Sequence, residues 1–98
     1  MWLLKTADEA DLPFTFRILA GSIKTIVRAA RADFIVDAPL VSRLHCRLTA
    51  GADDLELKDL DSTNGTFVNG QRIARALLKN GDKVGVGRVE LIVELVSS

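Results

Sequence analysis

Cysteine and histidine are almost absent from the sequence, which has one of each, Cys46 and His45, and tyrosine is missing altogether. A single cysteine cannot form a disulfide within the chain, and such scarcity is typical of proteins that stay in a reducing compartment. A structural zinc site takes four Cys or His ligands, more than this chain offers. The sequence therefore predicts an intracellular domain that folds around an apolar core with no disulfide, no metal and no other cofactor.

The sequence also lacks a net charge and a long apolar run. Thirteen Lys and Arg balance thirteen Asp and Glu, so the positive excess typical of proteins that bind nucleic acids or membrane surfaces is absent. No stretch approaches the roughly 18 apolar residues of a membrane span, and Met1 to Lys5 form too short an apolar start for a signal peptide. We therefore expect neither direct nucleic-acid binding nor a membrane partner.

The zero net charge is an average over segments of opposite sign. Residues 17–47 hold six basic and two acidic side chains, whereas residues 48–70 hold one basic and five acidic side chains. The excess in the basic segment is enough to attract one anionic group on a peptide, and it falls far short of a nucleic-acid surface.

Apolar residues alternate with polar ones along most of the chain, which predicts β-strands that bury one face. The pattern is present from Phe14 to Ala20, at Leu55 and Leu57, and from Val89 to Leu95. Short turn signals such as Asn69-Gly70 separate these runs. Many short strands with polar turns between them predict an all-β fold, an antiparallel β-sandwich.

With 98 residues and a mass of 10.7 kDa, the chain is long enough for one hydrophobic core and too short for two. We therefore expect a single domain over residues 1–98, cut from a longer protein, because Ser97-Ser98 follows the last expected strand like a domain edge. Two segments, Arg28–Ala32 and Ala74–Lys79, are rich in good helix formers. Both are shorter than a helix that is stable on its own, so ordered loops with at most one helical turn are expected there.

Hydrogen-bond donors gather in two loops, Val41–His45 and Asp61–Thr66, each of which directly precedes an expected strand. A sandwich presents such loops together at one end, and Arg28, at the end of the expected strand Lys24–Arg28, can join them. Arginine offers a fork of donors, while serine, threonine and asparagine add hydroxyl and amide donors. A pocket rich in donors and poor in acceptors favours an anion, and a phosphorylated side chain with about two negative charges suits it.

Three ordered motifs at matching spacing make most of the chain resemble a forkhead-associated (FHA) domain. The motifs are Arg28 with Asp33–Asp37 and Pro39, then Val41-Ser42-Arg43-Leu44-His45, and then Leu57–Gly70. The segment Asn80–Gly87 also matches the family's final turn and strand. The resemblance implies a β-sandwich of about 11 strands that binds phosphothreonine in protein partners through loops at one end. It implies a phosphopeptide-binding module rather than an enzyme, and it does not indicate a homodimer.

The resemblance also assigns the phosphopeptide contacts residue by residue. Arg28 and Ser42 would hold the phosphate, and Arg43 would help to bind the phosphate or its flanking residues. Thr63 would add a hydroxyl group, and Asn64 would bond the main chain of the peptide. No catalytic residue is implied.

His45 and Gly65 would support this site. His45 would tie the loop of Ser42 to its neighbour, and Gly65 would permit the tight turn that aims Asn64, because glycine accepts φ > 0 without steric cost. One position departs from the family pattern, since Val27 stands where a glycine usually precedes the phosphate-binding arginine. A β-branched residue is strained at φ > 0, so a pocket weakened by Val27 is an open alternative.

The first residues add a narrower resemblance. Met1-Trp2-Leu3-Leu4, followed by Phe16–Gly21, is similar to the amino terminus of nibrin, a DNA double-strand-break protein that begins with such a domain. This likeness implies signalling in the DNA damage response and DNA repair, in the nucleus. If the protein is not nibrin-like, the cytoplasm is the expected location. The general motif Ser62–Gly70 is shared by bacterial signalling proteins and does not settle the kingdom.

Two other functions stay open. If the pocket is degenerate, the domain is a phosphate-independent protein-interaction or dimerisation module whose sheet faces bind partners. A small hydrolase would need an activated nucleophile, and His45 with Cys46 cannot supply one, because neighbouring strand residues point to opposite faces. Paired phosphorylated and unphosphorylated threonine peptides test the first alternative, and turnover of a phosphopeptide tests the second.

Overall fold

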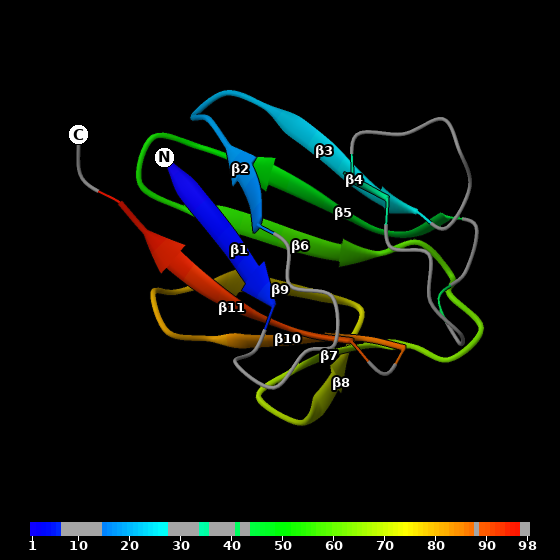
Figure 1. Ribbon diagram of the computed structural model, residues 1–98. Helices are drawn as coiled ribbons and strands as arrows, with labels where there is room; N and C mark the ends of the chain where they lie inside the picture. The colour runs from blue at the N-terminus through cyan, green and yellow to red at the C-terminus, as the bar shows by residue number, and fades with distance from the viewer. Residues whose placement is uncertain (7–14, 28–33, 36–40, 42–43, 88, 97–98) are drawn as a thin grey trace.

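The chain folds into two β-sheets that pack face to face (Figure 1). The computed structural model describes residues 1–6, 15–27, 34–35, 41, 44–87 and 89–96. These residues contain eleven strands and no helix. The strands are β1 (Trp2–Thr6), β2 (Thr15–Ile18), β3 (Ile23–Val27), β4 (Phe34–Ile35), β5 (Leu44–Ala50), β6 (Leu55–Asp59), β7 (Thr66–Val68), β8 (Gln71–Ile73), β9 (Arg75–Leu78), β10 (Lys83–Val86) and β11 (Val89–Leu95). The all-β sandwich expected from the sequence is therefore confirmed.

Six strands form one sheet, in the order β2-β1-β11-β10-β7-β8, and five form the other, in the order β4-β3-β5-β6-β9. The described strand pairs are antiparallel, as expected, except that the two-residue strand β4 runs parallel to β3 at the edge of its sheet. The first and last strands, β1 and β11, lie side by side with Trp2 opposite Leu95. The six-stranded sheet thus ties together the two ends of the described chain.

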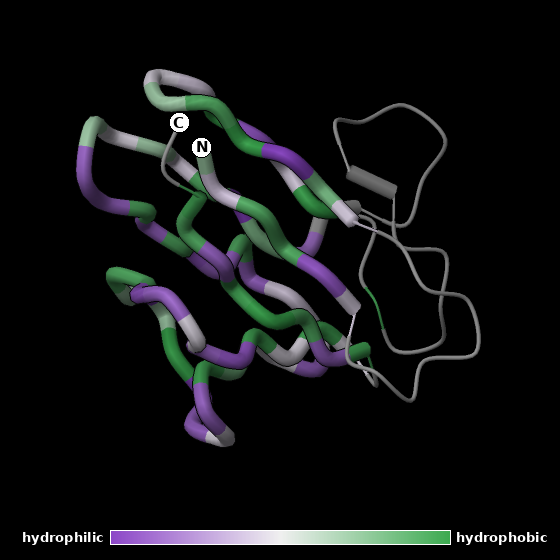
Figure 2. Tube along the Cα trace, turned by 60° about the vertical axis from the view of Figure 1, so that its left-hand side comes forward, coloured by the Kyte–Doolittle hydropathy of each residue, from purple (hydrophilic) through white to green (hydrophobic). Residues whose placement is uncertain are grey.

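The hydrophobic core fills the space between the two sheets. Leu55 and Leu57 of β6 and Leu91 and Val93 of β11 are buried, as the alternation predicts, whereas Leu95 at the end of β11 is 46% exposed. Figure 2 shows apolar and polar stretches alternating along the chain. The buried apolar residues are Trp2, Leu4, Ile18, Ile26, Val41, Cys46, Leu48, Ala50, Leu55, Leu57, Leu78, Val84, Val86, Leu91 and Val93.

Residues 74–79 correct one expectation, because most of them form a strand rather than a loop. β9 pairs antiparallel with β6, with Leu55 opposite Leu78, and Leu78 is buried in the core. Pairing with the edge of β6 and burial of Leu78 outweigh the helix propensity of this segment, since tertiary context routinely overrides propensity. The other segment rich in helix formers, residues 28–32, lies outside the described residues.

Asn69 and Gly70 form the two-residue turn between β7 and β8, as this dipeptide predicts. Their φ angles are 51° and 83°, the left-handed values that such a hairpin turn needs at both positions. The side-chain nitrogen of Asn69 donates to Asp82 (3.1 Å), and its side-chain oxygen accepts from the backbone amide of Lys83 (3.0 Å). The prediction that Asn69-Gly70 forms a turn is therefore confirmed.

Candidate functional site

The ends of three strands meet at one end of the five-stranded sheet. Val27, the last residue of β3, is the register partner of Leu44, the first residue of β5. Just after β6, the backbone amide of Leu60 donates to the carbonyl oxygen of His45 (3.0 Å). The end of β3, the start of β5 and the loop that follows β6 are therefore neighbours.

Three of the predicted phosphopeptide contacts, Arg28, Ser42 and Arg43, lie outside the described residues. Val27 and Leu44, which adjoin Arg28 and Arg43 in the sequence, are paired across β3 and β5. The pairing of β3 with β5 thus places Val27 and Leu44, the chain neighbours of Arg28 and Arg43, side by side.

Val27 has the extended backbone of a strand residue. It is paired with both Leu44 and Ile35, and the register of β3 with β5 shifts between Ile26 and Val27. This position therefore does not need a left-handed φ, the conformation in which a β-branched residue would be strained. Backbone strain at Val27 therefore gives no reason to expect a weakened pocket in this chain.

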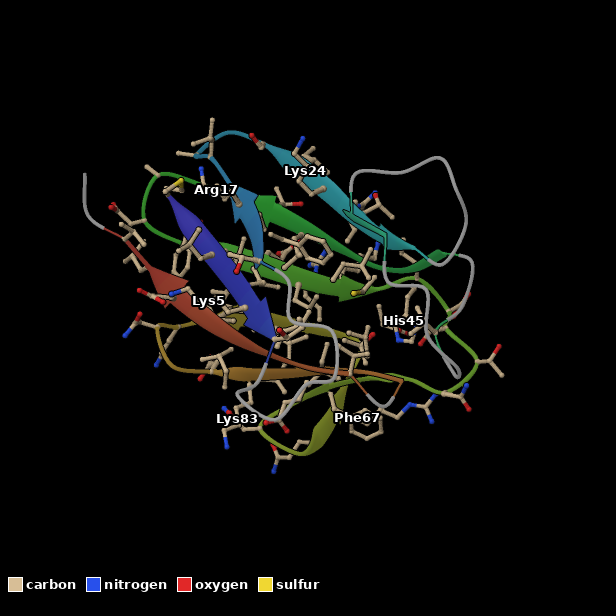
Figure 3. All side chains as sticks on the ribbon, in the orientation of Figure 1. Lys5, Arg17, Lys24, His45, Phe67 and Lys83 are labelled. Atoms are coloured by element: carbon tan, nitrogen blue, oxygen red, sulfur yellow. The ribbon has the colours of Figure 1, made fainter. Side chains whose placement is uncertain are left out.

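His45 joins the start of β5 to the loop between β6 and β7. Its side chain is fully buried, and Nε2 donates a hydrogen bond to the carbonyl oxygen of Gly65, 2.8 Å away and twenty residues further along the chain. Figure 3 places His45 at the end of the sandwich where β6 leaves its sheet. Because water does not compete for a buried hydrogen bond, this contact holds residues 60–65 firmly against β5.

A second set of hydrogen bonds closes the same loop at its base. Oδ1 of Asp59, the last residue of β6, accepts from the hydroxyl groups of Ser62 (2.5 Å) and Thr66 (2.7 Å), and Oδ2 accepts from the backbone amide of Ser62 (3.3 Å). Ser62 and Thr66 are both buried. Because Thr66 begins β7 of the other sheet, one carboxylate ties the two sheets together where residues 60–65 cross between them.

These hydrogen bonds favour the charged form of Asp59. Burial by itself would raise the pKa of its carboxyl group, but the hydrogen bonds from Ser62 and Thr66, together with nearby His45, outweigh burial and hold that pKa below its ordinary value of 3.8. The contribution of Asp59 to stability is therefore complete above the unfolded-state pKa. It is lost as the pH falls through the lower folded-state pKa.

Replacing Asp59 by asparagine should destabilise the domain at neutral pH and make its acid unfolding less steep. Asparagine keeps one acceptor oxygen but loses the charge, and hydrogen bonds to charged groups contribute about 1.5–3 kcal/mol each, so we expect a loss of about 1–3 kcal/mol at pH 7. Urea unfolding of both proteins, in steps from pH 7 to about pH 3, measures the difference across the window of this carboxyl group. Stability curves that ran parallel over the whole range would contradict the role of Asp59.

The loop presents Thr63 and Asn64 at its tip. Both residues are exposed, whereas the neighbouring Gly65 is buried. Asp61 and Gly65, on either side of the tip, have φ angles of 55° and 89°, left-handed values that glycine adopts freely and aspartate tolerates. The left-handed backbone expected at Gly65 is present, and these two turns expose Thr63 and Asn64 while His45 and Asp59 hold the base.

Arg72 of β8 adds a positive charge beside this loop. A Cβ atom on Gly65 would lie only 2.6 Å from Nε of Arg72, so the arginine side chain rests on the bare glycine backbone. Arg72 is itself exposed. The loop tip thus combines a hydroxyl group, an amide and a nearby guanidinium group, a set of donors that suits a phosphorylated ligand.

Sequence reasoning missed Asp59, Ser62, Thr66 and Arg72. A signal for the first two exists, because aspartate side chains commonly bond backbone and hydroxyl groups a few residues further along in turns. Thr66 and Arg72 belong to the six-stranded sheet, and no local sequence pattern indicates that they lie beside this loop.

Cys46 is a core residue rather than a reactive thiol. Its side chain is fully buried, and burial raises the pKa of the thiol to about 12, although a hydrogen bond with Thr66 acts in the opposite direction. A thiol that stays protonated at neutral pH is a poor nucleophile. Cys46 therefore acts as a small apolar residue of the core.

Within the part of the chain that the structure describes, no three or more His, Cys, Asp or Glu side chains are grouped to hold a metal ion. Every buried polar side-chain atom of the described residues has a hydrogen-bond partner. No helix of sufficient length and apolar character to cross a membrane is found in the described ranges.

The loop of residues 60–65, with Thr63 and Asn64 at its tip, is the candidate binding site.

Known proteins match both the sequence and the fold. The family model described as FHA domain matches residues 25–87. A structure solved for phosphothreonine-dependent FHA domain interactions superposes on this chain with a TM-score of 0.84 and 30% identity, over 99% of this chain and 98% of that one. The matched residues 25–87 contain every predicted site residue, from Arg28 to Gly65.

Two relatives from Mycobacterium tuberculosis match about three quarters of the chain. The ABC transporter ATP-binding/permease protein Rv1747 is 42% identical over 72 residues, which are 74% of this chain and 8% of the relative. The glycogen accumulation regulator GarA is 32% identical over 75 residues, 76% of this chain and 46% of the relative. The chain thus spans less than half the length of these two relatives. Both are bacterial, and they give no support to a nibrin-like identity, to DNA repair or to the nucleus.

Proposed function

Because the chain belongs to the FHA-domain family, we propose that it is a phosphopeptide-binding module that recognises phosphothreonine in partner proteins and performs no catalysis. The observation that carries this proposal is the loop of residues 60–65. His45 and Asp59 hold the loop closed, while Thr63 and Asn64 remain exposed at its tip. The similar structure solved for phosphothreonine-dependent FHA domain interactions supports the same ligand.

In this proposal the phosphate is bound by Arg28 and Ser42, with help from Arg43. Thr63 adds a hydroxyl group, and Asn64 bonds the main chain of the peptide. Hydrogen bonds that involve a charged group contribute about 1.5–3 kcal/mol each. Three or four of them reach the roughly 8 kcal/mol of a micromolar complex.

The proposed role is regulatory, because binding then depends on a kinase that phosphorylates the partner. The name of the relative GarA, a glycogen accumulation regulator, supports a role in regulation. We propose that residues 1–98 act as one binding module of a longer protein inside the cell. The proposed partner is a phosphorylated protein, with no part for nucleic acid or membrane.

Calorimetric titration with a pair of peptides that differ only in phosphorylation of one threonine tests this function. The phosphorylated peptide should bind with roughly micromolar affinity. Its unphosphorylated twin should bind at least about a hundredfold more weakly, because it loses the charge-assisted hydrogen bonds to Arg28 and Ser42. Equal affinities would favour a phosphate-independent interaction module instead.

A further inference from the structure

The outer face of the five-stranded sheet carries three cations side by side. Arg47 of β5 is the register partner of Lys58 in β6, and Lys58 is the register partner of Arg75 in β9. Their strand neighbours Cys46 and Leu57 are buried in the core. Because successive strand residues point to opposite faces, the three cationic side chains point toward solvent. We refer to Arg47, Lys58 and Arg75 as the basic row.

Among the described residues, one acidic side chain pairs with the basic row. Glu56 lies 3.6 Å from Arg75, and the ion pairs among the described residues include neither Arg47 nor Lys58. On the far side of Arg47, the register partner in β3 is the uncharged Thr25. Like charges directly opposite one another across strands destabilise a sheet, so the isolated domain carries a cost here that an acidic partner would offset.

The basic row lies next to the candidate site. Arg47 is two residues from His45 in β5, about 7 Å along an extended strand, and Lys58 directly precedes Asp59 in β6. His45 and Asp59 are the side chains that hold the loop of residues 60–65. A peptide bound at that loop therefore needs only a few more residues to reach the row.

We propose that the basic row binds an acidic segment of the same phosphoprotein, a few residues away from its phosphothreonine. This inference rests on the proposed function and adds a charge pattern to the partner. Neighbouring strands lie about 4.8 Å apart and an extended peptide rises about 3.3 Å per residue, so acidic side chains within about five residues span the row. The attraction acts between charges on the solvent-facing side of the sheet, and salt therefore screens it.

Phosphothreonine peptides that differ only in a distant run of residues test the inference. Each peptide carries about five glutamates or five glutamines beyond a short Gly-Ser linker, at its amino end in one pair and at its carboxyl end in the other. In at least one pair we expect the glutamate peptide to bind about threefold to tenfold more tightly at low salt, as three exposed ion pairs of ordinary strength would provide. The gain should shrink at an ionic strength of about 1 M, where the screening length is about 3 Å.

The variant Arg47→Gln/Lys58→Gln/Arg75→Gln should lose the gain from the glutamate run and keep its affinity for the glutamine peptide. A gain that survives in this variant overturns the assignment of the basic row. The inference is also wrong if a DNA duplex binds the native row more tightly than the glutamate peptide does. Self-association of the domain that the variant abolishes would assign the face to a second copy of the chain and overturn it too.

A matched control removes the same amount of charge elsewhere. Arg17, Lys79 and Lys83 are exposed cations away from the basic row, and the variant Arg17→Gln/Lys79→Gln/Lys83→Gln should keep the gain. Loss of the gain in this control as well would show that only net charge matters, which contradicts a specific row.

Failure of this inference can be told apart from failure of the proposed function. If the glutamine phosphopeptides bind and glutamate adds nothing at either end, the inference is wrong while the proposed function stands. If phosphorylated peptides bind no better than their unphosphorylated twins, the proposed function is wrong. The inference, which rests on that function, is then wrong as well.

Discussion

Replacing His45 by alanine is expected to lower the free energy of unfolding by about 3–5 kcal/mol and to abolish phosphopeptide binding. The change leaves a cavity in place of a fully buried imidazole ring, and it leaves the carbonyl oxygen of Gly65 without its donor at 2.8 Å. It also releases the loop that presents Thr63 and Asn64. Urea unfolding measures the first effect, and calorimetry in the cold, where the variant stays folded, measures the second.

Two variants separate the loss of stability from the loss of the site. Leu55 is also fully buried, at the opposite end of β6 from the loop, and Leu55→Ala should cost about 2–5 kcal/mol while the folded protein keeps its affinity. His45→Gln retains an N–H donor and should recover part of both losses. If His45→Ala binds the phosphopeptide as tightly as Leu55→Ala does, His45 does not position the site.

Replacing Arg28 by alanine is expected to weaken phosphothreonine binding about tenfold to a hundredfold or more, because the phosphate loses a charge-assisted partner worth about 1.5–3 kcal/mol. Arg28→Lys keeps the charge but not the fork of donors that matches a phosphate, so its affinity should lie between those of the native protein and the alanine variant. Calorimetry with one phosphothreonine peptide measures all three proteins.

Arg31→Ala provides the matched control for Arg28→Ala. Arg31 has the same charge and lies three residues further along the chain, but no motif links it to the phosphate. Its replacement should leave the affinity nearly unchanged. Unchanged affinity in Arg28→Ala, or equal losses in the two variants, would remove Arg28 from the proposed site.

Local alternation is sufficient to identify strands that build the core. Leu57 and Leu91 are buried as predicted, because side chains alternate between the faces of a strand in any sheet. Alternation does not report which strands pair. The parallel pairing of the two-residue strand β4 with β3 has no local signal. β9 forms a strand because it pairs with β6 and buries Leu78 in the core.

The short likeness of Met1-Trp2-Leu3-Leu4 to nibrin has a simpler physical explanation. Trp2 and Leu4 are both buried, on the inner face of the first strand. Any sandwich that begins with a core strand needs large apolar residues at alternate positions there. Such a pattern reports the fold and carries little information about the parent protein.

The candidate site is only partly encoded in local sequence. Asn64-Gly65 is a turn signal, and the φ of 89° at Gly65 follows from it directly. The contact between His45 and Gly65 spans twenty residues, so local spacing does not indicate it. The family resemblance implies a structural role for His45 but does not name Gly65 as its partner. The bond between Asp59 and Ser62 has a local sequence signal, whereas Thr66 reaches Asp59 from the other sheet and has none.

Nuclear magnetic resonance of the ¹⁵N-labelled domain, titrated with a phosphothreonine peptide and with its unphosphorylated twin, tests whether the loop of residues 60–65 binds phosphothreonine. The phosphorylated peptide should shift the amide signals of residues 60–65 and of His45, and the twin should leave them in place. Equal shifts with both peptides, or shifts with the phosphorylated peptide that spare residues 60–65, would contradict this role of the loop.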